Sequence, residues 1–470
     1  MGYKDLRSFL DKLEEEKLLI KYSDEIQQFP DVGHISRAVT DMGHYGPAVI
    51  MDNIAGYKGK RLVVGVHGSW ANHALMFGLP KETTLKEQFF ELLRIWDSYP
   101  GEVEFVDNAP CQEVVYDKDI NLYEIMPLYR SNALDGGCYF SKAAIISREP
   151  YDPDNFDAVN VGCYRVQVQG PDTLGFQTAP FHDLGEHVAQ AERENEPLPI
   201  VITIGNDPLT NFMASTSIAY NESEYKYVAA MGGFTYPLTK SLEAGIPIPA
   251  NSEYVVEGYV VPNKRVVEGP FCEYPGSYTG LRRQLEIKVT KVTTRKDPIF
   301  ESLYIGFPWN EADTLQALNT SIPIYKQVKK DFPGLVAVNA MYQCGQTVIV
   351  STSQRMAGQA KTIAMRVLST THQAYVRNLI IVDAEVDPFN WEEITWALST
   401  RVRRQDISII EGAPGSHILP NCPASVTDHK LIIDATTPVP PDKLMKESKI
   451  AWKEPQVSEW AAILSNLQNI

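Results

Sequence analysis

The sequence predicts a multidomain chain of mixed α+β and α/β class. Its length of 470 residues favours about three domains of roughly 150 residues each. Two patterns along the chain support this class. Residues 111–305 hold many candidate strands and few candidate helices, which indicates a barrel or a sandwich. Residues 306–436 alternate strands with helices, which is typical of a layered α/β domain.

The N-terminal segment, residues 1–110, has mixed α/β patterning. It begins with a predicted amphipathic helix, because apolar residues recur near helical spacing among Lys and Glu: Leu6, Phe9, Leu10, Leu13 and Leu18. Residues 61–66 then read as a strand.

The strand-rich segment, residues 111–305, is interrupted by one predicted helix at about 184–194. Apolar and polar residues alternate around Val166 and Val168, so one face of that strand is expected to be buried. The strand candidates are 164–169, 199–204, 254–261 and 286–292.

The segment 306–436 contains a strand-to-helix unit. Residues 379–382 form a short apolar run typical of a buried strand. Asn390 then reads as a helix N-cap, with Glu392 and Glu393 in the first helical turn.

The last segment, residues 437–470, combines a stiff proline-rich linker at 437–442 with a predicted helix. The helix carries an apolar stripe: Trp460, Ile463, Leu464 and Leu467. Such a stripe docks either on a neighbouring subunit or on its own domain, and the sequence leaves both open.

Charge and composition exclude several classes of partner. The 43 basic and 59 acidic residues give a net charge of -16, without the basic stripe of a nucleic-acid or anionic-membrane binder. No apolar run approaches the roughly 20 residues of a membrane helix. We expect no signal segment, and the six scattered cysteines indicate reduced thiols, so a cytoplasmic protein is predicted.

Three stretches of the strand-rich segment combine charged and metal-competent residues: 160–165, 180–183 and 267–276. Taken singly, their residues have ordinary structural explanations. Asn160 and His182 can cap an element, Glu224 can be a solvated carboxylate, and Arg165 can face solvent.

Glu268 and Glu273 form a more specific pattern. Gly269-Pro270 favours a turn that brings both carboxylates to one site. Two close carboxylates do not both ionise easily without a cation between them, and the one with the raised pKa suits a general acid. Arg165 is the candidate cation, because its guanidinium grips carboxylates bidentately. An ordinary loop with two exposed acids is the alternative.

The stretch 268–273, Glu-Gly-Pro-Phe-Cys-Glu, resembles the E-G-P-F-G-E signature of the UbiD family of decarboxylases, with Cys272 in place of the usual glycine. Residues 385–390 and 396–401 resemble the C-terminal signatures of that family. Residues 67–70 and 432–438 resemble its hydroxyarylic-acid branch, whose members act on 4-hydroxybenzoate- or vanillate-like acids. The resemblance runs over most of the chain.

The resemblance implies a fold with a central split β-barrel that binds flavin, over 111–305. An N-terminal α/β segment (1–110) and a C-terminal layered α/β domain for oligomerisation and closure (306–436) flank it, and a linker and C-terminal helix (437–470) follow. The implied assembly is a homodimer or homohexamer. A flavin prenyltransferase would supply the cofactor.

The resemblance also implies a reaction, the non-oxidative and reversible decarboxylation of an aromatic acid with prenylated FMN. Glu273 would be the general acid, Arg165 would orient the substrate carboxylate, and Glu268 would hold Arg165. A Mn²⁺ or Mg²⁺ ion would link the protein to the phosphate of the cofactor, with K⁺ nearby. The implied metal ligands are Asn160, His182 and Glu224, and the implied cofactor contacts add Cys163, Tyr164, Arg165, Phe181 and Ser215.

Some expectations stay open. The family lysine near residues 370–374 has no counterpart here, and His372 is the substitute candidate. The branch favours a phenolic acid, but a pocket with small residues could accept a larger fused ring, such as an indole or phenazine acid. The small residues are Ala312 and Thr314, Phe181 would place an apolar ring near the cofactor, and Tyr274 is a further candidate pocket residue. A carboxylase, a subunit of a carboxylating complex and a non-catalytic flavin scaffold are the alternatives.

Overall fold

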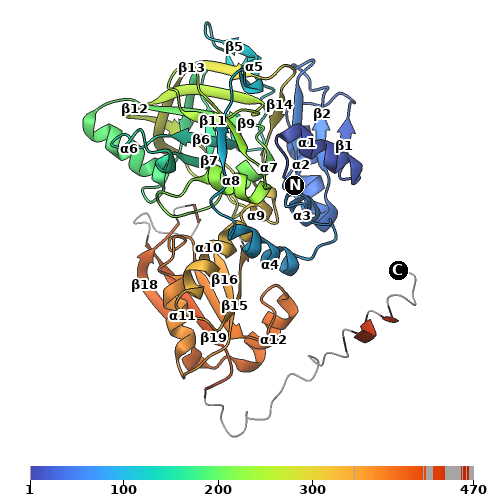
Figure 1. The fold of residues 1–470 in the computed structure, drawn as a ribbon, viewed down its shortest axis with the longest axis vertical. Helices are drawn as coiled ribbons and strands as arrows, with labels where there is room; N and C mark the ends of the chain where they lie inside the picture. Colours follow the sequence, from blue (N-terminus) through green and yellow to red (C-terminus); the bar gives the residue numbers. More distant parts are fainter. Residues whose placement is uncertain are drawn as a thin grey trace. The chain divides into compact units, whose positions relative to one another are not determined.

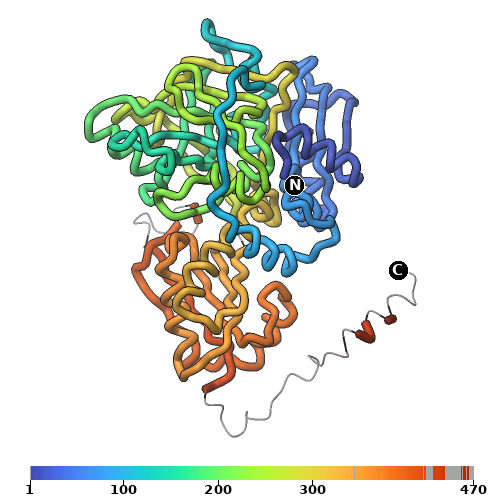
Figure 2. Tube along the Cα trace, viewed as in Figure 1, coloured from blue at the N-terminus to red at the C-terminus, as the bar shows by residue number. Residues whose placement is uncertain are grey.

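A computed structural model describes residues 2–342, 344–416, 418–419, 427–439, 457, 459–461 and 463–464. The chain divides into two compact units; Figures 1 and 2 colour the chain by residue number, from blue at the N-terminus to red. The first comprises Met1–Pro323, Ala340–Gly345 and Ser416–Thr427. The second comprises Ile324–Asn339, Gln346–Gly415 and Asp428–Ile470.

The centre of the first unit is a closed β-barrel (Figure 1). Seven strands run in the order β12-β9-β6-β7-β8-β13-β5, and an additional β12–β13 pairing closes six of them. The barrel prediction is therefore confirmed over the sandwich alternative. The strands are β5 (Val114–Tyr116), β6 (Tyr139–Ser147), β7 (Asn160–Val168), β8 (Thr173–Phe176), β9 (Leu198–Ile204), β12 (Tyr254–Glu268) and β13 (Arg282–Thr294).

The barrel core follows from the alternation of apolar residues along its strands. Val166 and Val168 of β7 are buried as predicted, with Leu174 of β8 and Ile200 of β9 in the same core. At Gly258 of β12 a Cβ would lie 2.2 Å from the Lys288 carbonyl oxygen, so only glycine allows this close pairing of β12 with β13.

Helices cover the barrel and carry several candidate site residues. The predicted helix at 184–194 is confirmed as α6 (Asp183–Glu194). It is followed by α7 (Pro208–Ala214), α8 (Glu224–Gly232) and, after the barrel, α9 (Glu311–Leu315). α5 (Leu122–Ile125) precedes β6.

The N-terminal part of this unit holds a four-stranded sheet in the order β1-β2-β3-β14. The predicted first helix is confirmed, with Asp5 as its N-cap, but Leu18 lies beyond its end, and the predicted strand at 61–66 ends at Val64. The elements are α1 (Leu6–Glu15), β1 (Leu19–Tyr22), α2 (Asp31–Asp41), η1 (Gly43–Tyr45), β2 (Ala48–Met51), β3 (Arg61–Val64), α3 (Trp70–Met76), α4 (Leu85–Trp96) and β14 (Ile299–Glu301).

A small sheet and two short 3-10 helices complete the first unit. The sheet has the order β11-β10-β4. Its strands are β4 (Val103–Phe105), β10 (Tyr236–Lys240) and β11 (Pro247–Pro249), and the 3-10 helices are η2 (Pro110–Gln112) and η3 (Phe156–Ala158).

The second unit is built around a five-stranded sheet in the order β15-β16-β17-β19-β18. The predicted strand at 379–382 is β17, which pairs in parallel with β16 and β19. The elements that lie wholly or mostly in this unit are α10 (Leu318–Lys329, which begins in the first unit), β15 (Leu335–Tyr342), β16 (Thr347–Thr352), α11 (Gln359–Val367), β17 (Asn378–Asp383), α12 (Trp391–Arg401), η4 (Arg404–Asp406), β18 (Ile407–Pro414) and β19 (Thr427–Ala435).

The predicted N-cap of α12 is confirmed. The Asn390 side chain accepts the backbone N–H of Glu392 at 3.0 Å and that of Glu393 at 3.3 Å. This contact satisfies two of the N–H groups that a helix start leaves without partners.

The predicted C-terminal stripe is described in part. Trp460, Ile463 and Leu464 are helical and exposed, whereas Leu467 and residues 440–442 of the linker lie outside the described residues. Within the portion of the chain that the structure describes, none of the helices combines the length and the apolar character needed to cross a bilayer.

Candidate active site

Strand β7 carries a row of candidate site residues on one face. Cys163, Arg165 and Gln167 alternate with the core residues of the strand, so their side chains point out of the barrel core. Helix α7, which leads into Ser215, packs against β7. Residues of β7, of α7 and of the end of β12 therefore lie together on the outer face of β7.

At the middle of this row Arg165 is bound between two glutamates. Its Nε and Nη2 donate to the two Glu268 carboxylate oxygens at 3.0 and 2.9 Å, and its Nη1 donates to Glu273. The three side chains are 8%, 0% and 8% exposed, so water screens the charges little. Burial opposes the charge of Arg165, but Glu273 and Glu268 outweigh it and raise the pKa of the guanidinium above its usual range. The alternative of an exposed loop with two solvated acids is wrong.

The two glutamates have unequal partners. Glu268 accepts the bidentate pair from Arg165 and also the Tyr139 hydroxyl at 3.2 Å. Glu273 accepts one N–H from Arg165. Glu268 is therefore held by three hydrogen bonds, whereas the contact of Glu273 within this arrangement is the one from Arg165.

The turn predicted at Gly269-Pro270 is present. Glu268 ends β12, and the chain returns through Glu273, whose backbone N–H donates to the Ser277 carbonyl at 3.0 Å. Gly269 has φ of +99°, a conformation that favours glycine. Residues 269–279, which we call the acid loop, thus bring Glu273 back to Arg165.

The start of β7 and the neighbouring helices α7 and α8 carry buried polar groups. Among the described residues, the Asn160 amide nitrogen, the Ser215 hydroxyl and one Glu224 carboxylate oxygen have no hydrogen-bond partner. Burial raises the pKa of the Glu224 carboxyl well above its usual range, although its own backbone N–H and that of Val161 oppose the rise. Buried polar groups without partners are costly, which indicates that they serve a bound group.

His182 and Phe181 lie at the start of α6. The His182 Nδ1 accepts the Ala179 N–H at 3.4 Å, and its ring lies 5.7 Å from that of Tyr164. The Phe181 ring contacts His182 edge-on and is 49% exposed. Asp183, the next residue, contributes to the raised pKa of Glu224, which ties this segment electrostatically to α8.

No group of three or more His, Cys, Asp or Glu side chains within the described ranges is arranged to hold a metal ion. The predicted triad contains two such residues together with Asn160. Its chemistry, one imidazole with carboxylate and amide oxygens, suits Mn²⁺ or Mg²⁺. Burial raises the pKa of the Cys163 thiol to about 11, so Cys163 stays protonated and is a poor metal ligand.

Of the predicted pocket residues, Tyr274 belongs to the acid loop, Ala312 and Thr314 lie on α9 next to it, and Phe181 lies apart from them in sequence, at the start of α6. The Tyr274 carbonyl accepts the Asn310 side chain at 3.5 Å, next to α9, which bears Ala312 and Thr314. The Thr314 hydroxyl accepts the Trp309 indole N–H at 3.0 Å. Tyr274, Ala312 and Thr314 are all buried.

His372 belongs to the second unit and is buried there. Burial lowers the pKa of its imidazole to about 4, so the ring is neutral near pH 7. A neutral imidazole does not replace the charge of a lysine.

Sequence reasoning missed a buried charge cluster around Lys142 of β6. The Lys142 ammonium donates to Glu301 at 2.7 Å, to Glu311 at 3.3 Å and to the His67 Nδ1 at 2.7 Å. Burial and the Lys142 charge hold the pKa of His67 well below its usual range. The signal was a lone lysine in the apolar run 139–146, since a buried lysine needs charged partners.

The sequence also gave no indication of Tyr139 or Asp135. Both contact the acid loop: the Tyr139 hydroxyl donates to the Pro270 carbonyl at 3.5 Å and to Glu268 just before the loop, and Asp135 accepts the Cys272 backbone N–H at 2.8 Å. No local pattern marks such long-range partners.

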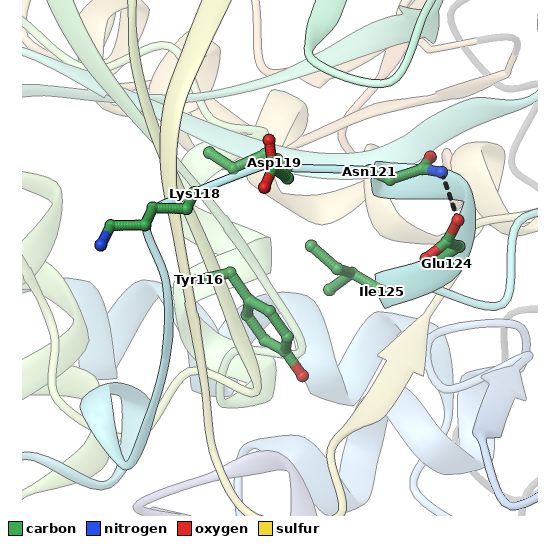
Figure 3. Close-up of a pocket in the computed structure, with 7 residues that line it drawn as sticks. Tyr116, Lys118, Asp119, Asn121, Glu124 and Ile125 are labelled. Atoms are coloured by element: carbon green, nitrogen blue, oxygen red, sulfur yellow. Dashed lines mark hydrogen bonds between the residues drawn. The ribbon is translucent and has the colours of Figure 1, made fainter.

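A separate cavity of about 230 Å³ lies at β5 and α5 (Figure 3). Tyr116, Lys118 and Asp119 line it, and the Asn121 amide donates to Glu124 across its rim at 2.7 Å. None of the predicted site residues lines this cavity.

Comparison with known families identifies the chain. The family models of 3-octaprenyl-4-hydroxybenzoate carboxy-lyase match residues 10–92 with the N-terminal domain, 104–308 with the Rift-related domain and 313–435 with the C-terminal domain. The chain belongs to the UbiD family, in its hydroxyarylic-acid branch, and is a carboxy-lyase that decarboxylates an aromatic acid.

Individual relatives agree with this assignment. The phenolic acid decarboxylase of Sedimentibacter hydroxybenzoicus is 49% identical over 471 residues, covering 99% of this chain and 98% of the relative. The closed form of vanillic acid decarboxylase (ShVdcCD) from the same organism matches with a TM-score of 0.94 and 48% identity, covering 100% of both chains. An evolved dimeric form of the UbiD-class enzyme HmfF from Pelotomaculum thermopropionicum, in complex with prFMN, matches with a TM-score of 0.81 and 25% identity over 96% of this chain and 99% of that chain.

Proposed function

We propose that this chain removes CO₂ from a phenolic acid with prenylated FMN, with Glu273 as proton donor and Arg165 orienting the substrate carboxylate. The observation that carries the proposal is the buried Glu268–Arg165–Glu273 arrangement. The relatives named as phenolic acid decarboxylases support the substrate class.

Arg165 has donors left for a substrate. A guanidinium has five N–H groups. Among described residues, three of them bind Glu268 and Glu273, so two stay available to a carboxylate. Glu268 holds the guanidinium plane fixed, which orients these donors before the acid binds.

The proton follows from the same arrangement. When the bond to CO₂ breaks, the ring carbon keeps the electron pair and needs one proton in its place. Glu273 would deliver that proton and then take another from solvent, which balances the reaction of one carboxylate and one proton to one arene and CO₂. Prenylated FMN would supply the electron sink that an aryl carbanion requires.

The buried unpartnered groups fit a phosphate and its cation. The Glu224 carboxylate, the Asn160 amide oxygen and the His182 imidazole, which also accepts the Ala179 N–H, would hold Mn²⁺ or Mg²⁺. Ser215 would contact the phosphate, with Cys163 and Tyr164 of β7 beside it and K⁺ nearby. From residue 161 to residue 165 β7 spans about 13 Å, which separates this end from the Arg165 end. The flavin would lie along this row, with Phe181 near its rim.

The choice of phenolic acid depends on the pocket beside Tyr274. Small Ala312 would leave room for a fused ring, such as an indole or phenazine acid, whereas the Thr314 hydroxyl is engaged by Trp309. A panel of carboxyl-¹³C acids tests this: 4-hydroxybenzoate, vanillate and indole-3-carboxylate, with protein co-produced with a flavin prenyltransferase. Release of ¹³CO₂ from the single-ring acids alone would refute the larger pocket. No release from any acid would refute the proposed function.

Assembly and location are part of the proposal. A cytoplasmic homodimer or homohexamer is proposed, with the exposed stripe of Trp460, Ile463 and Leu464 as a candidate contact. Because the Sedimentibacter enzyme includes a ShVdcD component, an accessory chain is a second candidate partner. Light scattering of the purified protein, alone and after co-production with such a chain, distinguishes these assemblies.

A further inference from the structure

The acid loop is bound on its outer side by the turn that precedes β6, residues 131–137. Five hydrogen bonds join the two segments directly or through the Gln167 side chain, and the fifth is made by Asp135. The Gly136 N–H donates to the Pro270 carbonyl at 2.7 Å, and the Leu134 N–H donates to the Tyr278 hydroxyl at 3.2 Å. Gln167 of β7 accepts the Gly269 N–H at 3.2 Å and donates to the Gly136 carbonyl at 3.1 Å.

Asp135 is the charged member of this contact. Its side chain is buried, and one oxygen accepts the Cys272 N–H at 2.8 Å. The other oxygen accepts the Asn132 N–H at 2.8 Å, which fixes the carboxylate within its own turn. Cys272 directly precedes Glu273 in the chain, so the bond from its N–H to Asp135 fixes the backbone from which the Glu273 side chain extends.

The packing leaves this contact little freedom. A Cβ at Gly136 would lie 2.1 Å from the Gly269 carbonyl oxygen, so the two backbones meet as closely as glycine allows. Cys272 is 6% exposed beneath the same contact. Burial, Asp135 and Glu273 together raise the pKa of its thiol to about 12.

We propose that Asp135 is a positioning residue for the proton donor: by accepting the Cys272 N–H it holds the acid loop so that Glu273 meets Arg165. The inference rests on the proposed function of Glu273. Four charged or titratable side chains act on Asp135 or share its surroundings: Arg130, Tyr139, Cys272 and Tyr278. Burial raises the pKa of the Asp135 carboxyl to about 6, so it is ionised and the bond is charge-assisted at pH 7.5.

The test compares Asp135→Asn with the wild type, both loaded with prenylated FMN. Asparagine keeps the shape but can accept at one atom only, so one of the two backbone donors loses its acceptor. Loss of a hydrogen bond to a charged group changes an equilibrium constant by a factor of roughly 10–100. We expect alkylation of Cys272 by N-ethylmaleimide at pH 7.5, followed by peptide mass, to be faster by about that factor. We expect kcat to fall by a similar factor with KM within about twofold.

Two controls make the result specific. Cys111, which is fully buried, reports general opening of the fold, and its labelling is expected to stay unchanged. Asp428→Asn changes a buried aspartate of the second unit, which accepts the His429 N–H at 2.8 Å, and should alter neither Cys272 labelling nor kcat. If Asp135→Asn also exposes Cys111, hydrogen exchange of the Cys272 N–H in the wild-type protein replaces it: slow exchange supports the bond to Asp135, and exchange as fast as in an unfolded chain overturns the inference.

The outcomes separate the inference from the proposed function. Unchanged Cys272 labelling overturns the inference, and so does faster labelling with full kcat, because the loop would then be held without effect on the donor. A wild type that releases no CO₂ overturns the proposed function. Labelling of Cys272 then decides alone whether Asp135 holds the loop.

Discussion

Replacing Glu273 by glutamine tests the assignment of the proton donor. Glutamine keeps the size of the side chain and an oxygen for the Arg165 N–H, but it has no proton to give. General-acid catalysis contributes a factor of about 10²–10⁴, so kcat is expected to fall by that amount, equivalent to roughly 3–5 kcal/mol in the barrier.

The structure limits the other consequences of this change. Arg165 keeps its two bonds to Glu268 at 3.0 and 2.9 Å, so it stays oriented toward the substrate carboxylate. KM and flavin content are therefore expected to stay near the wild-type values. The free energy of unfolding should fall by no more than about 1–3 kcal/mol, because one charge-assisted hydrogen bond becomes a neutral one.

Steady-state CO₂ release and urea unfolding measure these quantities. Glu268→Gln is the informative comparison, because it weakens the hold on Arg165 and should raise KM as well as lower kcat. Glu286→Gln is the matched control: Glu286 is 7% exposed on β13 and pairs with Lys264 at 2.7 Å. A Glu273→Gln enzyme with full flavin and full kcat would refute the reasoning.

Three further changes test the surroundings of the site. Tyr139→Phe removes a hydrogen bond to the Glu268 carboxylate and should cost about 1.5–3 kcal/mol in urea unfolding, with a lower kcat; an unchanged unfolding curve would contradict the contact. Lys142→Met leaves two buried carboxylates without their cation and should cost about 3–5 kcal/mol, whereas a loss below 1 kcal/mol would show that they are not charged. Burial raises the pKa of Asp207 to about 6 from 3.8 in the unfolded chain. The contribution of the protonated Asp207 carboxyl to stability is therefore present below about pH 4 and is lost as the pH rises to about 6. In the Asp207→Asn variant the free energy of unfolding should change less with pH between about 4 and 6 than in the wild type.

Features set by nearby residues could be predicted from the sequence. The helix α6 and the Asn390 cap follow from local periodicity and capping, and the turn at Gly269-Pro270 follows from local turn chemistry. The strand pattern alone left a barrel and a sandwich open, because closure depends on the β12–β13 pairing rather than on any single strand. The family resemblance implied the barrel.

Contacts between distant residues could not be predicted. Asp135 and Cys272 are 137 positions apart, and Tyr139 and Glu268 are 129 apart. The family resemblance predicted that Arg165, Glu268 and Glu273 form one site. The residue pattern alone showed only that a turn could bring the three side chains together. Neither source indicated the partners that hold the acid loop, because those partners are recognised by contact and not by spacing.

The measurement that tests the proposed function most directly combines the mass of the bound flavin with the rate of ¹³CO₂ release. Protein co-produced with a flavin prenyltransferase is divided in two: the flavin released from one half is weighed, and the other half is given carboxyl-¹³C 4-hydroxybenzoate. The account predicts the mass of prenylated FMN and release of ¹³CO₂ that depends on it, since protein loaded with plain FMN should release none. Equal release with plain FMN, or none with prenylated FMN bound, would contradict it.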